Sequence, residues 1–310
     1  MYPLKLESVL KDIIWGGTRL SEQFSKGEKN QKIAEAWVLS CRNDGENVIL
    51  NGDYAGKALS EIYPDKDNFP LLIKLIDASD KLSVQVHPDD AFAKQEGLPA
   101  GKTEMWYIID AVPGAKLVYG MKNADTLSDE QIKAAAENGT LENYLNYVEV
   151  KKGDVFFIPA GLVHAIGAGI LIAEVQQNSN TTYRMYDYNR CGTDGKPREL
   201  HIDNAIRVMS KNSPDATSDQ TDIVSDDKIK YTNICSCEYF NVYTLDIKNS
   251  SYKITSKDNM NFILCIEGQG EIVYNGSKYR FEKGESYLLP EDISEFEIRS
   301  SECQVMHVTE

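Results

Sequence analysis

The sequence predicts a mainly-β protein made of two related barrels or sandwiches, with a small helical insertion in or beside the first. Three observations support this fold class: short β-rich segments bounded by turn residues, one helix with a capping motif, and a strand motif that recurs in the C-terminal part. The chain has 310 residues, which is the length of two domains of about 150 residues each.

Apolar segments rich in β-branched and aromatic residues follow one another through the first part of the chain. Most of them are bounded by Gly, Pro, Asp or Asn, which are the residues that form turns between strands. The predicted strand segments are 69–77, 81–87, 104–110, 116–120, 154–159, 169–177 and 181–188. Short strands at this spacing are typical of an antiparallel barrel or sandwich.

One helical region interrupts these strands, and we expect it over about residues 127–147. Ser128 and Gln131 have the spacing of a capping box, and the Ala-rich segment that begins there ends at Gly139. A second short helix is expected directly afterwards, over 141–147.

The composition changes after a further helix that we expect within 199–210. The next segment is polar, acidic and poor in large apolar residues, which is typical of a linker. We therefore predict an N-terminal catalytic domain over 1–210, a linker over 211–228, and a second strand-rich domain over 229–310.

A strand motif occurs once in each predicted domain. Gly153 precedes Pro159 by six residues, and Gly284 precedes Pro290 by the same offset. In both copies a basic-Gly-acidic turn leads into an apolar strand. Equivalent hairpins in two related barrels give this pattern, although Lys-Gly-acid is also a common hairpin turn.

The composition and charge exclude several classes of function. The chain is 42% hydrophobic and 26% charged, which is ordinary for a folded protein and too apolar for a disordered one. Its 48 acidic and 33 basic residues leave a net charge of −15, which repels nucleic-acid phosphates and anionic lipid surfaces. We expect neither nucleic acid nor a membrane as a partner.

Neither a targeting segment nor a disulfide framework is visible in the sequence. Segment 1–17 lacks a basic region followed by an apolar stretch and a cleavage site, and no apolar run reaches 18 residues. We therefore expect a cytoplasmic protein. The six cysteines are scattered without a C-x-x-C pair, and Cys235 and Cys237 alone are a weak metal signal.

Four polar side chains that suit a divalent metal ion lie on or beside predicted strands. Strand alternation puts Gln85 and His87 on one face, and Glu104 begins another strand. His164 follows a Pro-Ala-Gly turn, from which its imidazole can point into the mouth of a barrel. Each residue alone has an ordinary structural role. Together, two imidazoles, a carboxylate and an amide oxygen suit zinc or a similar first-row ion.

The motifs that contain these residues resemble two known families. Gly-x5-Pro-x-Gly-x2-His at 153–164 resembles the second metal-binding motif of the cupin superfamily. QVHP at 85–88 with the following DD, GKTEMWY at 101–107, the PAG turn, and NSNTTYR at 178–184 resemble the type I mannose-6-phosphate isomerases, specifically their short bacterial branch. The resemblance extends in order over about residues 3–310.

The resemblance implies two cupin-like jelly-roll barrels and the reversible interconversion of D-mannose 6-phosphate and D-fructose 6-phosphate, through an enediol or enediolate. It also implies one zinc ion per chain, held by the positions that match Gln85, His87, Glu104 and His164. The partner is then a small sugar phosphate. Long members of the family usually have His-Lys-Pro-Glu where this chain has Gly-Lys-Thr-Glu at 101–104, so no role of that histidine carries over.

Two cationic residues are the candidates for catalysis. Strand alternation places Arg184 on the opposite face from Tyr183 and Met185, and its guanidinium suits an enediolate or a substrate phosphate. The resemblance also has an active-site arginine at this position. Lys102 precedes Glu104 by two residues, so one cavity can receive both side chains. We expect Lys102 to transfer a proton or to orient the substrate.

A third cation, Lys74, is a candidate for substrate binding. It lies inside the apolar strand segment 69–77, where an unpaired ammonium is costly to bury. A phosphate partner in the barrel would offset that cost. The alternative is that Lys74 faces solvent on an edge strand.

Two other functions fit the same residues. Two imidazoles and a carboxylate also make the facial triad of non-haem iron oxygenases. Gln85 argues against this function, because a fourth protein ligand takes a position that an oxygenase keeps open. The second alternative is a sugar-phosphate-binding cupin without activity. The presence of Lys102 and Arg184, the two candidates for catalysis, argues against it.

We expect the C-terminal barrel to bind no metal and to cover the first barrel. Its copy of the strand motif has Glu295 at the position that corresponds to His164, and His307 has no second histidine nearby in the sequence. The sequence does not specify the oligomeric state.

Overall fold

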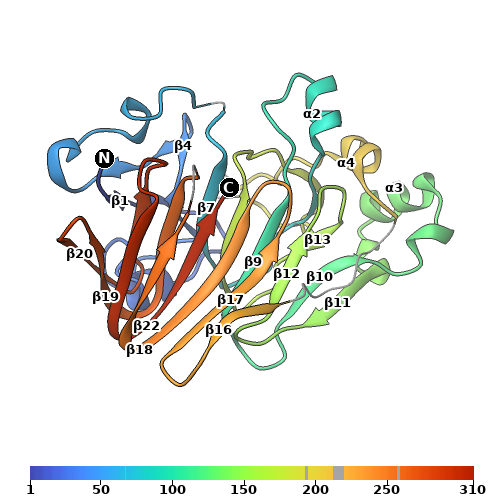
Figure 1. Cartoon of the computed structure of the whole chain (residues 1–310). Coiled ribbons are helices and arrows are strands. Elements are labelled where there is room, and N and C mark those ends of the chain that lie inside the picture. The colour runs from blue at the N-terminus through green and yellow to red at the C-terminus, as the bar shows by residue number, and fades with distance from the viewer. Residues whose placement is uncertain (67, 193–194, 212–219, 257–258) are drawn as a thin grey trace.

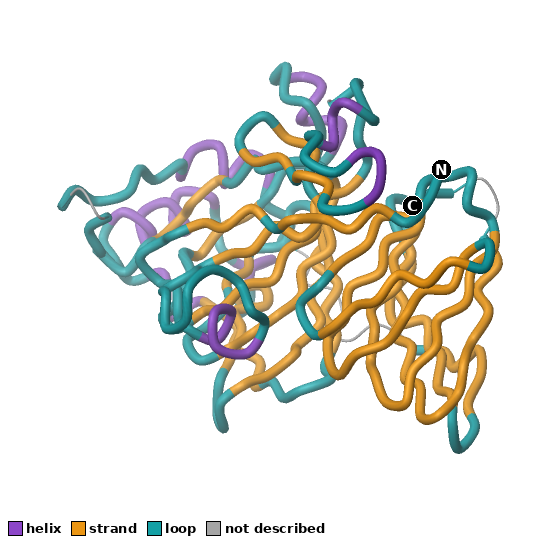
Figure 2. The backbone as a smooth tube through the Cα atoms, turned by 90° about the vertical axis from the view of Figure 1, so that its left-hand side faces the viewer, coloured by secondary structure: helices purple, strands orange, loops and turns teal. Residues whose placement is uncertain are grey.

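Strands are the most frequent secondary structure of the backbone, as Figure 2 shows. The structure is a computed structural model of the chain and describes residues 1–66, 68–192, 195–211, 220–256 and 259–310. The C-terminal strands lie at the left of Figure 1, and the longer helices lie at the right, on the far side of the first barrel. The mainly-β fold class predicted from the sequence is confirmed.

Two antiparallel sheets face each other in the first barrel. One sheet joins, in spatial order, β12 (Val155–Ile158), β9 (Glu104–Ala111), β14 (Ile170–Gln177), β7 (Leu71–Ala78), β3 (Glu35–Leu39) and β2 (Val9–Lys11). The other joins β11 (Leu145–Glu149), β10 (Lys116–Met121), β13 (His164–Ala165), β8 (Val84–Val86) and β15 (Tyr183–Tyr186). A short hairpin of β4 (Cys41–Arg42) and β5 (Gly45–Glu46) lies outside both sheets.

The C-terminal strands form a further antiparallel sheet. In spatial order it joins β16 (Thr221–Ser225), β17 (Ile229–Ser236), β18 (Asn241–Thr255), β22 (Glu295–Thr309), β19 (Asn261–Tyr274), β21 (Ser286–Leu289), β1 (Leu4–Glu7) and β6 (Val48–Ile49), and β20 (Ser277–Glu282) pairs with β19. Strand β1 comes from the start of the chain, with Leu4 opposite Leu288 of β21. N-terminal residues therefore complete the C-terminal sheet.

This pairing crosses the domain division expected from the sequence, which stays a prediction. Of the expected linker 211–228, residues 212–219 lie outside the described residues. The later part is not a plain linker, because Thr221–Ser225 forms β16 and pairs with β17.

The sheet that contains β7 and β14 is covered on both faces, so every residue of these two strands is buried. On one face, Trp106 and Phe156 pack with Tyr119 of the opposite sheet in the core of the first barrel. On the other face, Ile73 packs in a cluster that includes Phe262 of the C-terminal sheet. This packing agrees with the expectation that the C-terminal barrel covers the first.

The helix with the predicted capping box is α3 (Asp129–Glu137). The backbone N–H of Gln131 donates a hydrogen bond to the Ser128 hydroxyl, and the backbone N–H of Ser128 donates to the side-chain oxygen of Gln131. These bonds satisfy backbone donors that a helix start leaves unpaired. The other helices are α1 (Arg19–Gln23), α2 (Asp90–Gln95), α4 (Ile202–Val208) and the 3-10 segments Gly52–Tyr54, Leu59–Glu61 and Ala124–Thr126. None of the described helices has the length and apolar character needed to cross a membrane.

The second helix expected over 141–147 is only partly correct. A 3-10 helix spans Leu141–Tyr144, and β11 begins at Leu145. Residues of β11 pair with β10, with Glu149 opposite Lys116. The ladder bonds to β10 therefore override the local helical preference, which is a weak determinant of structure.

The repeated strand motif forms the same hairpin in both barrels. Gly153 and Gly284 have φ values of 89° and 88°, in the left-handed region that favours glycine. Each glycine lies two residues before a four-residue strand, β12 or β21, and each strand ends directly before the proline of its motif.

Candidate metal centre and active site

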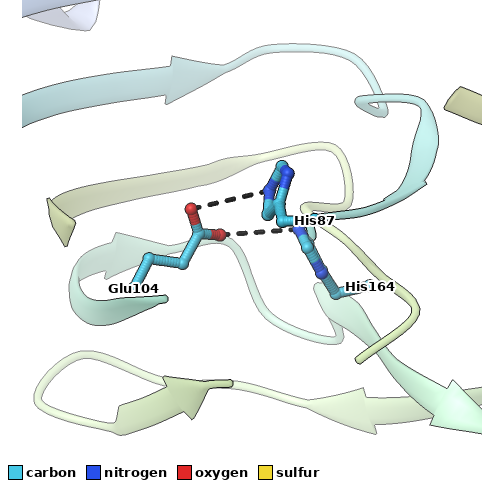
Figure 3. A group of neighbouring side chains, drawn as sticks. All are labelled: His87, Glu104 and His164. Carbon is cyan, nitrogen blue, oxygen red and sulfur yellow. Dashed lines mark ion pairs between the residues drawn. The ribbon is translucent and has the colours of Figure 1, made fainter. Parts of the chain in front are cut away.

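Three buried side chains meet inside the first barrel: His87 directly follows β8, and Glu104 and His164 begin β9 and β13. His87, Glu104 and His164 each offer a potential ligand atom, and these atoms lie within 4.8 Å of one another. Figure 3 shows the two carboxylate oxygens of Glu104 facing the two imidazoles, at 3.7 Å from His87 Nε2 and 3.5 Å from His164 Nε2. The positions chosen from the sequence thus bring two imidazoles and a carboxylate to one point.

Backbone carbonyl groups fix the orientation of both imidazoles. His87 Nδ1 lies 2.9 Å from the Thr181 carbonyl oxygen, and His164 Nδ1 lies 2.8 Å from the Leu162 carbonyl oxygen. Because a carbonyl oxygen only accepts, Nδ1 carries the proton in each ring and donates it. Nε2 then keeps a lone pair directed toward Glu104, which is the arrangement of a metal-binding imidazole.

Strand pairing and one turn hold the ligand group together. Gln85 on β8 lies opposite His164 on β13, and the Gln85 amide is 3.4 Å from His164 Nε2. In the turn before His164, the Gly161 amide donates to the His87 carbonyl oxygen at 2.9 Å. Gly161 has a φ of 86°, a conformation that a residue with a side chain rarely adopts. The amide expected as fourth ligand therefore lies beside the other three groups.

Several polar atoms of this group are buried without a hydrogen bond. Within the described residues, His87 Nε2 and both carboxylate oxygens of Glu104 have no hydrogen-bond partner. Lys102 Nζ lies 3.1 Å from one of these oxygens, an ion-pair contact without hydrogen-bond geometry. Buried polar atoms left in this state are costly. A zinc-type cation bound by these groups and Gln85 would satisfy them, so the residues fit such an ion.

Burial keeps both imidazoles neutral. It lowers the pKa of His164 to about 4 and holds the pKa of His87 well below its ordinary value. Burial also raises the pKa of Glu104, and the nearby Glu174 raises it further. A divalent cation at this point favours the ionised carboxylate. Neutral imidazole and ionised carboxylate are the forms that bind metals.

Lys74 belongs to a buried ion pair beside the metal group. Lys74 on β7 lies opposite Glu174 on β14, with 3.0 Å between Nζ and Oε1, and a Glu35 oxygen lies 3.9 Å from Nζ. Burial alone would lower the pKa of Lys74, but these two carboxylates raise it above its ordinary value. Lys74 is 3% exposed on a central strand, so the edge-strand alternative is wrong. Its role toward a substrate phosphate stays a prediction.

A cavity of about 310 Å³ lies next to the metal group. Gln85, Lys102, Lys74 and Arg184 all line it. Gln85 belongs both to this lining and to the ligand group, so the metal group forms part of the cavity wall. The structure therefore brings the candidate metal, catalytic and substrate-binding residues to one place.

Strand β15 directs Arg184 toward the cavity. Arg184 pairs with Gln85 across the sheet, and its two neighbours in the strand are buried on the other face, as alternation predicts. The guanidinium donates to the Ser83 hydroxyl at 3.2 Å and to the Glu199 carbonyl oxygen at 2.7 Å. Both acceptors are neutral, so they leave the positive charge of Arg184 uncompensated.

The sequence analysis missed Arg198, which also lines the cavity. Arg198 donates to both carboxylate oxygens of Asp187, at 2.7 Å and 2.5 Å, and Arg190 donates to the same carboxylate at 2.7 Å. Arg190 also pairs with Asp80 at 3.1 Å, so two guanidinium groups and two carboxylates form one network beside the cavity. Arg198 lies in a polar loop with no local motif, so no sequence signal marks it.

The cations of the cavity lining outnumber its carboxylates, but most of them are already paired. The described lining contains the cations Lys74, Lys102, Arg184 and Arg198 and the carboxylates Glu35 and Glu174. Lys74, Lys102 and Arg198 form ion pairs with Glu174, Glu104 and Asp187, whereas Arg184 donates to neutral acceptors. Arg184, together with a divalent cation at the metal group, would therefore supply the positive charge that attracts an anionic ligand.

Comparisons with known proteins show the family to which the chain belongs. A family model described as the catalytic domain of type I phosphomannose isomerase matches residues 3–107, and a model of the mannose-6-phosphate isomerase cupin domain matches residues 230–310. The mannose-6-phosphate isomerase ManA of Bacillus subtilis is 39% identical to this chain over 99% of both proteins. The chain belongs to the type I phosphomannose isomerase family.

Further relatives support this assignment. A mannose-6-phosphate isomerase of Streptococcus mutans is 36% identical, with 95% of this chain and 94% of the relative covered. The crystal structure of the mannose 6-phosphate isomerase from Bacillus subtilis matches with a TM-score of 0.90 and 33% identity over 99% of both chains. The family, the cupin fold and the enzyme class predicted from the sequence, an isomerase, are confirmed. The roles of individual site residues stay predictions.

Proposed function

We propose that this protein interconverts D-mannose 6-phosphate and D-fructose 6-phosphate. The relatives named above carry the name of this activity and cover nearly the whole chain. The observation that carries the proposal is the buried His87–Glu104–His164 group beside a cavity lined by Lys102 and Arg184. The group suits a Lewis-acid ion, and the cavity suits a sugar phosphate.

The proposed metal is zinc, one ion per chain, with Gln85, His87, Glu104 and His164 as ligands. When bound, it supplies Lewis-acid stabilisation of negative charge that develops on substrate oxygens. The isomerisation involves no net redox change, so an ion without redox chemistry suffices. The unpartnered buried atoms of His87 and Glu104 support this assignment.

The isomerisation moves one proton between neighbouring carbon atoms. A base removes the proton from the carbon next to the carbonyl, and the electron pair of that bond forms an enediolate. A proton then returns to the former carbonyl carbon, and the proton of the neighbouring hydroxyl passes to the former carbonyl oxygen, so that the hydroxyl carbon becomes the new carbonyl. Lys102 is our candidate for transferring this proton or orienting the sugar. Its side chain lines the cavity, is 3% exposed, and lies 3.1 Å from Glu104, so bulk water has little access to it.

Two arginines are our candidates for binding the negative charges. We assign the enediolate to Arg184, because its guanidinium lies opposite Gln85 and has only neutral acceptors. We assign the phosphate to Arg198, which lines the cavity and is held in place by the carboxylate of Asp187. Lys74 remains a further candidate for substrate binding, although Glu174 already neutralises it.

The two alternative functions predict different measurements. A non-haem iron oxygenase consumes oxygen when loaded with ferrous iron, and the position of Gln85 beside His164 argues against the open site that it needs. A sugar-phosphate-binding protein without activity binds the substrate and leaves it unchanged. Family membership and the uncompensated Arg184 favour the isomerase over both.

An assay that detects fructose 6-phosphate in a coupled reaction tests the proposal. The zinc-loaded protein should convert mannose 6-phosphate, and it should convert unphosphorylated mannose far less efficiently, because the cavity cations then have no anion to bind. Binding of mannose 6-phosphate without any product would refute the isomerase assignment. Oxygen uptake by the iron-loaded protein would favour the oxygenase.

We further propose a cytoplasmic location, which suits an enzyme whose relatives act in sugar-phosphate metabolism. The proposed domains remain 1–210 and 229–310, with strand β1 completing the C-terminal sheet.

A further inference from the structure

The C-terminal barrel contains a cavity of its own, of about 480 Å³. Residues of β16, β17, β18 and β22 line it, and β17, β18 and β22 run side by side in Figure 1. The lining is rich in tyrosine and neutral polar side chains, including Tyr231, Tyr243, Tyr252, His307 and Asn241. Nothing in the reaction proposed above uses these residues.

Strand register shows that this cavity occupies the same place in the second barrel as the active-site cavity does in the first. In the first barrel, β12 pairs with β9 so that Ile158 lies opposite Glu104. In the second, β21 pairs with β19 so that Leu289 lies opposite Asn261. Because Ile158 and Leu289 both end the repeated motif, Asn261 is the structural counterpart of Glu104.

The next strand extends the correspondence. Gln176 lies opposite Glu104, and Thr309 lies opposite Asn261, so β14 corresponds to β22. Two residues earlier on these strands are Glu174 and His307. Glu174 pairs with Lys74 on β7, and His307 pairs with Tyr243 on β18. The positions that hold the buried Lys74–Glu174 ion pair in the first barrel hold Tyr243 and His307 in the second.

Hydrogen bonds fix His307 as a neutral part of this cavity. The Asn261 side-chain nitrogen donates to the Asn259 carbonyl oxygen, which directs Oδ1 of Asn261 toward His307 Nε2 at 2.9 Å. Nε2 therefore donates, and Nδ1 accepts from the Tyr231 hydroxyl at 2.8 Å. Both ring nitrogens form hydrogen bonds, and His307 is 2% exposed. The ring is therefore held in the cavity wall and has no free nitrogen to bind a metal.

Tyrosine rings provide the apolar surface of the cavity. Tyr231 lies between Tyr243 and Tyr252, with 5.1 Å between ring centroids on each side, and Tyr243 stacks on His307 at 5.4 Å. Tyr243 and Tyr252 are only half-buried, so their rings can contact a ligand. Rings with polar tips suit a ligand that has both an apolar face and hydroxyl groups.

The charge of this cavity differs from that of the active site. Among its described lining residues the only charged side chain is Lys253, which is neutralised by Glu295 at 2.7 Å. The lining therefore offers no free cation for a phosphate. It offers amide and hydroxyl groups from residues such as Asn241 and Thr309.

We propose that the cavity beside Tyr231, Tyr243 and His307 binds the pyranose ring of a neutral sugar. The tyrosine rings would pack against the C–H face of the sugar, and the amide and hydroxyl groups would bind its hydroxyls. This second site would discriminate against sugar phosphates, which the first cavity favours. The inference does not depend on the proposed isomerase activity.

Calorimetric titration and ligand-observed NMR with the full chain test this site. The probes are methyl α-D-mannopyranoside and methyl α-D-glucopyranoside, whose blocked anomeric carbon prevents ring opening and isomerisation. We expect saturable binding of at least one glycoside to the wild type, unaffected by saturating mannose 6-phosphate. Tyr243→Ala should raise the dissociation constant by at least about tenfold, because it removes one aromatic face, and isomerase turnover should stay unchanged.

Two further variants keep the test specific. Tyr252→Ala removes the other half-buried ring and should weaken binding in the same way. Tyr274→Ala is the matched control, because Tyr274 is half-buried in the same barrel but does not line the cavity; it should bind as the wild type does. Absence of saturable binding, displacement by mannose 6-phosphate, or unchanged binding in folded Tyr243→Ala and Tyr252→Ala would each overturn the proposal.

Discussion

Replacing Arg184 tests how the cavity stabilises negative charge during the reaction. The perturbation is Arg184→Ala, with Arg184→Lys as the conservative variant. In the wild type, the guanidinium holds the Ser83 hydroxyl and the Glu199 carbonyl oxygen, both neutral, and it belongs to no described ion pair. Its charge is therefore available to an anion on the substrate.

The structure predicts a small effect on folding and a large effect on rate. Loss of one part-buried and one exposed hydrogen bond to neutral acceptors costs about 0.5–1.5 kcal/mol in stability. Loss of one preorganised contact to charge that forms in the transition state typically lowers the rate about 10²- to 10³-fold. Arg184→Lys keeps the charge but not the planar fork that reaches both Ser83 and Glu199, so it should recover only part of the rate.

The assay measures kcat and KM for mannose 6-phosphate, with zinc content and melting temperature measured on the same preparations. A fall in kcat with little change in KM is expected for a contact made in the transition state. A rise in KM, with weaker discrimination against unphosphorylated mannose, would move Arg184 to phosphate binding. Arg299→Ala, an exposed arginine of the C-terminal barrel, is the control. Near-wild-type turnover in Arg184→Ala would remove this residue from the mechanism.

Three further predictions concern the buried charges and imidazoles. His164→Ala should lose most of its bound zinc by elemental analysis, and full occupancy would contradict the ligand assignment. Lys74→Met should lose about 3–5 kcal/mol of unfolding free energy in denaturant titration, because Glu174 stays buried without its partner; Glu174→Gln in the same chain should restore part of it. Burial lowers the pKa of His307 to about 3, so the unfolded chain binds the proton first. The free energy of unfolding should therefore fall by about 3 kcal/mol between pH 7.5 and pH 4.5 because of His307 alone. If the His307→Gln variant lost as much stability over this pH range as the wild type, this prediction would be wrong.

Local patterns predicted parts of the metal group, and the family resemblance implied how the parts combine. Gln85 and His87 share a face by strand alternation, and the Gly161 turn before His164 is recognisable in the sequence. The repeated Gly-Pro motif likewise predicted two equivalent hairpins, because each copy carries its own turn and strand. Such short-range patterns determine strand faces and turns without knowledge of the partner strand.

Features that depend on long-range pairing were not predictable from one sequence. The N-terminal strand β1 joins the C-terminal sheet through β21, and nothing in LKLE identifies that partner. The charge of Lys74 is balanced by Glu174 on a strand 100 residues away in sequence, so its partner could be found only once β7 and β14 were paired. Arg198 reaches the cavity from a loop, whose path no periodicity describes.

The helix expected over 141–147 shows the same limit. Its residues have no strong local preference against a helix, yet β10 offers an unpaired edge to residues 145–149. Backbone pairing satisfies the donors and acceptors of that edge, and the tertiary context decides the outcome.

Zinc titration of the stripped protein tests the central claim, that this chain is an isomerase whose activity depends on the His87–Glu104–His164 group. Protein freed of metal with a chelator would receive increasing zinc, and bound zinc and turnover of mannose 6-phosphate would be measured at each step. The account predicts negligible turnover at the start, a rise in proportion to bound zinc, and a plateau at one equivalent per chain. Full turnover without metal, or no turnover at one bound equivalent, would contradict it.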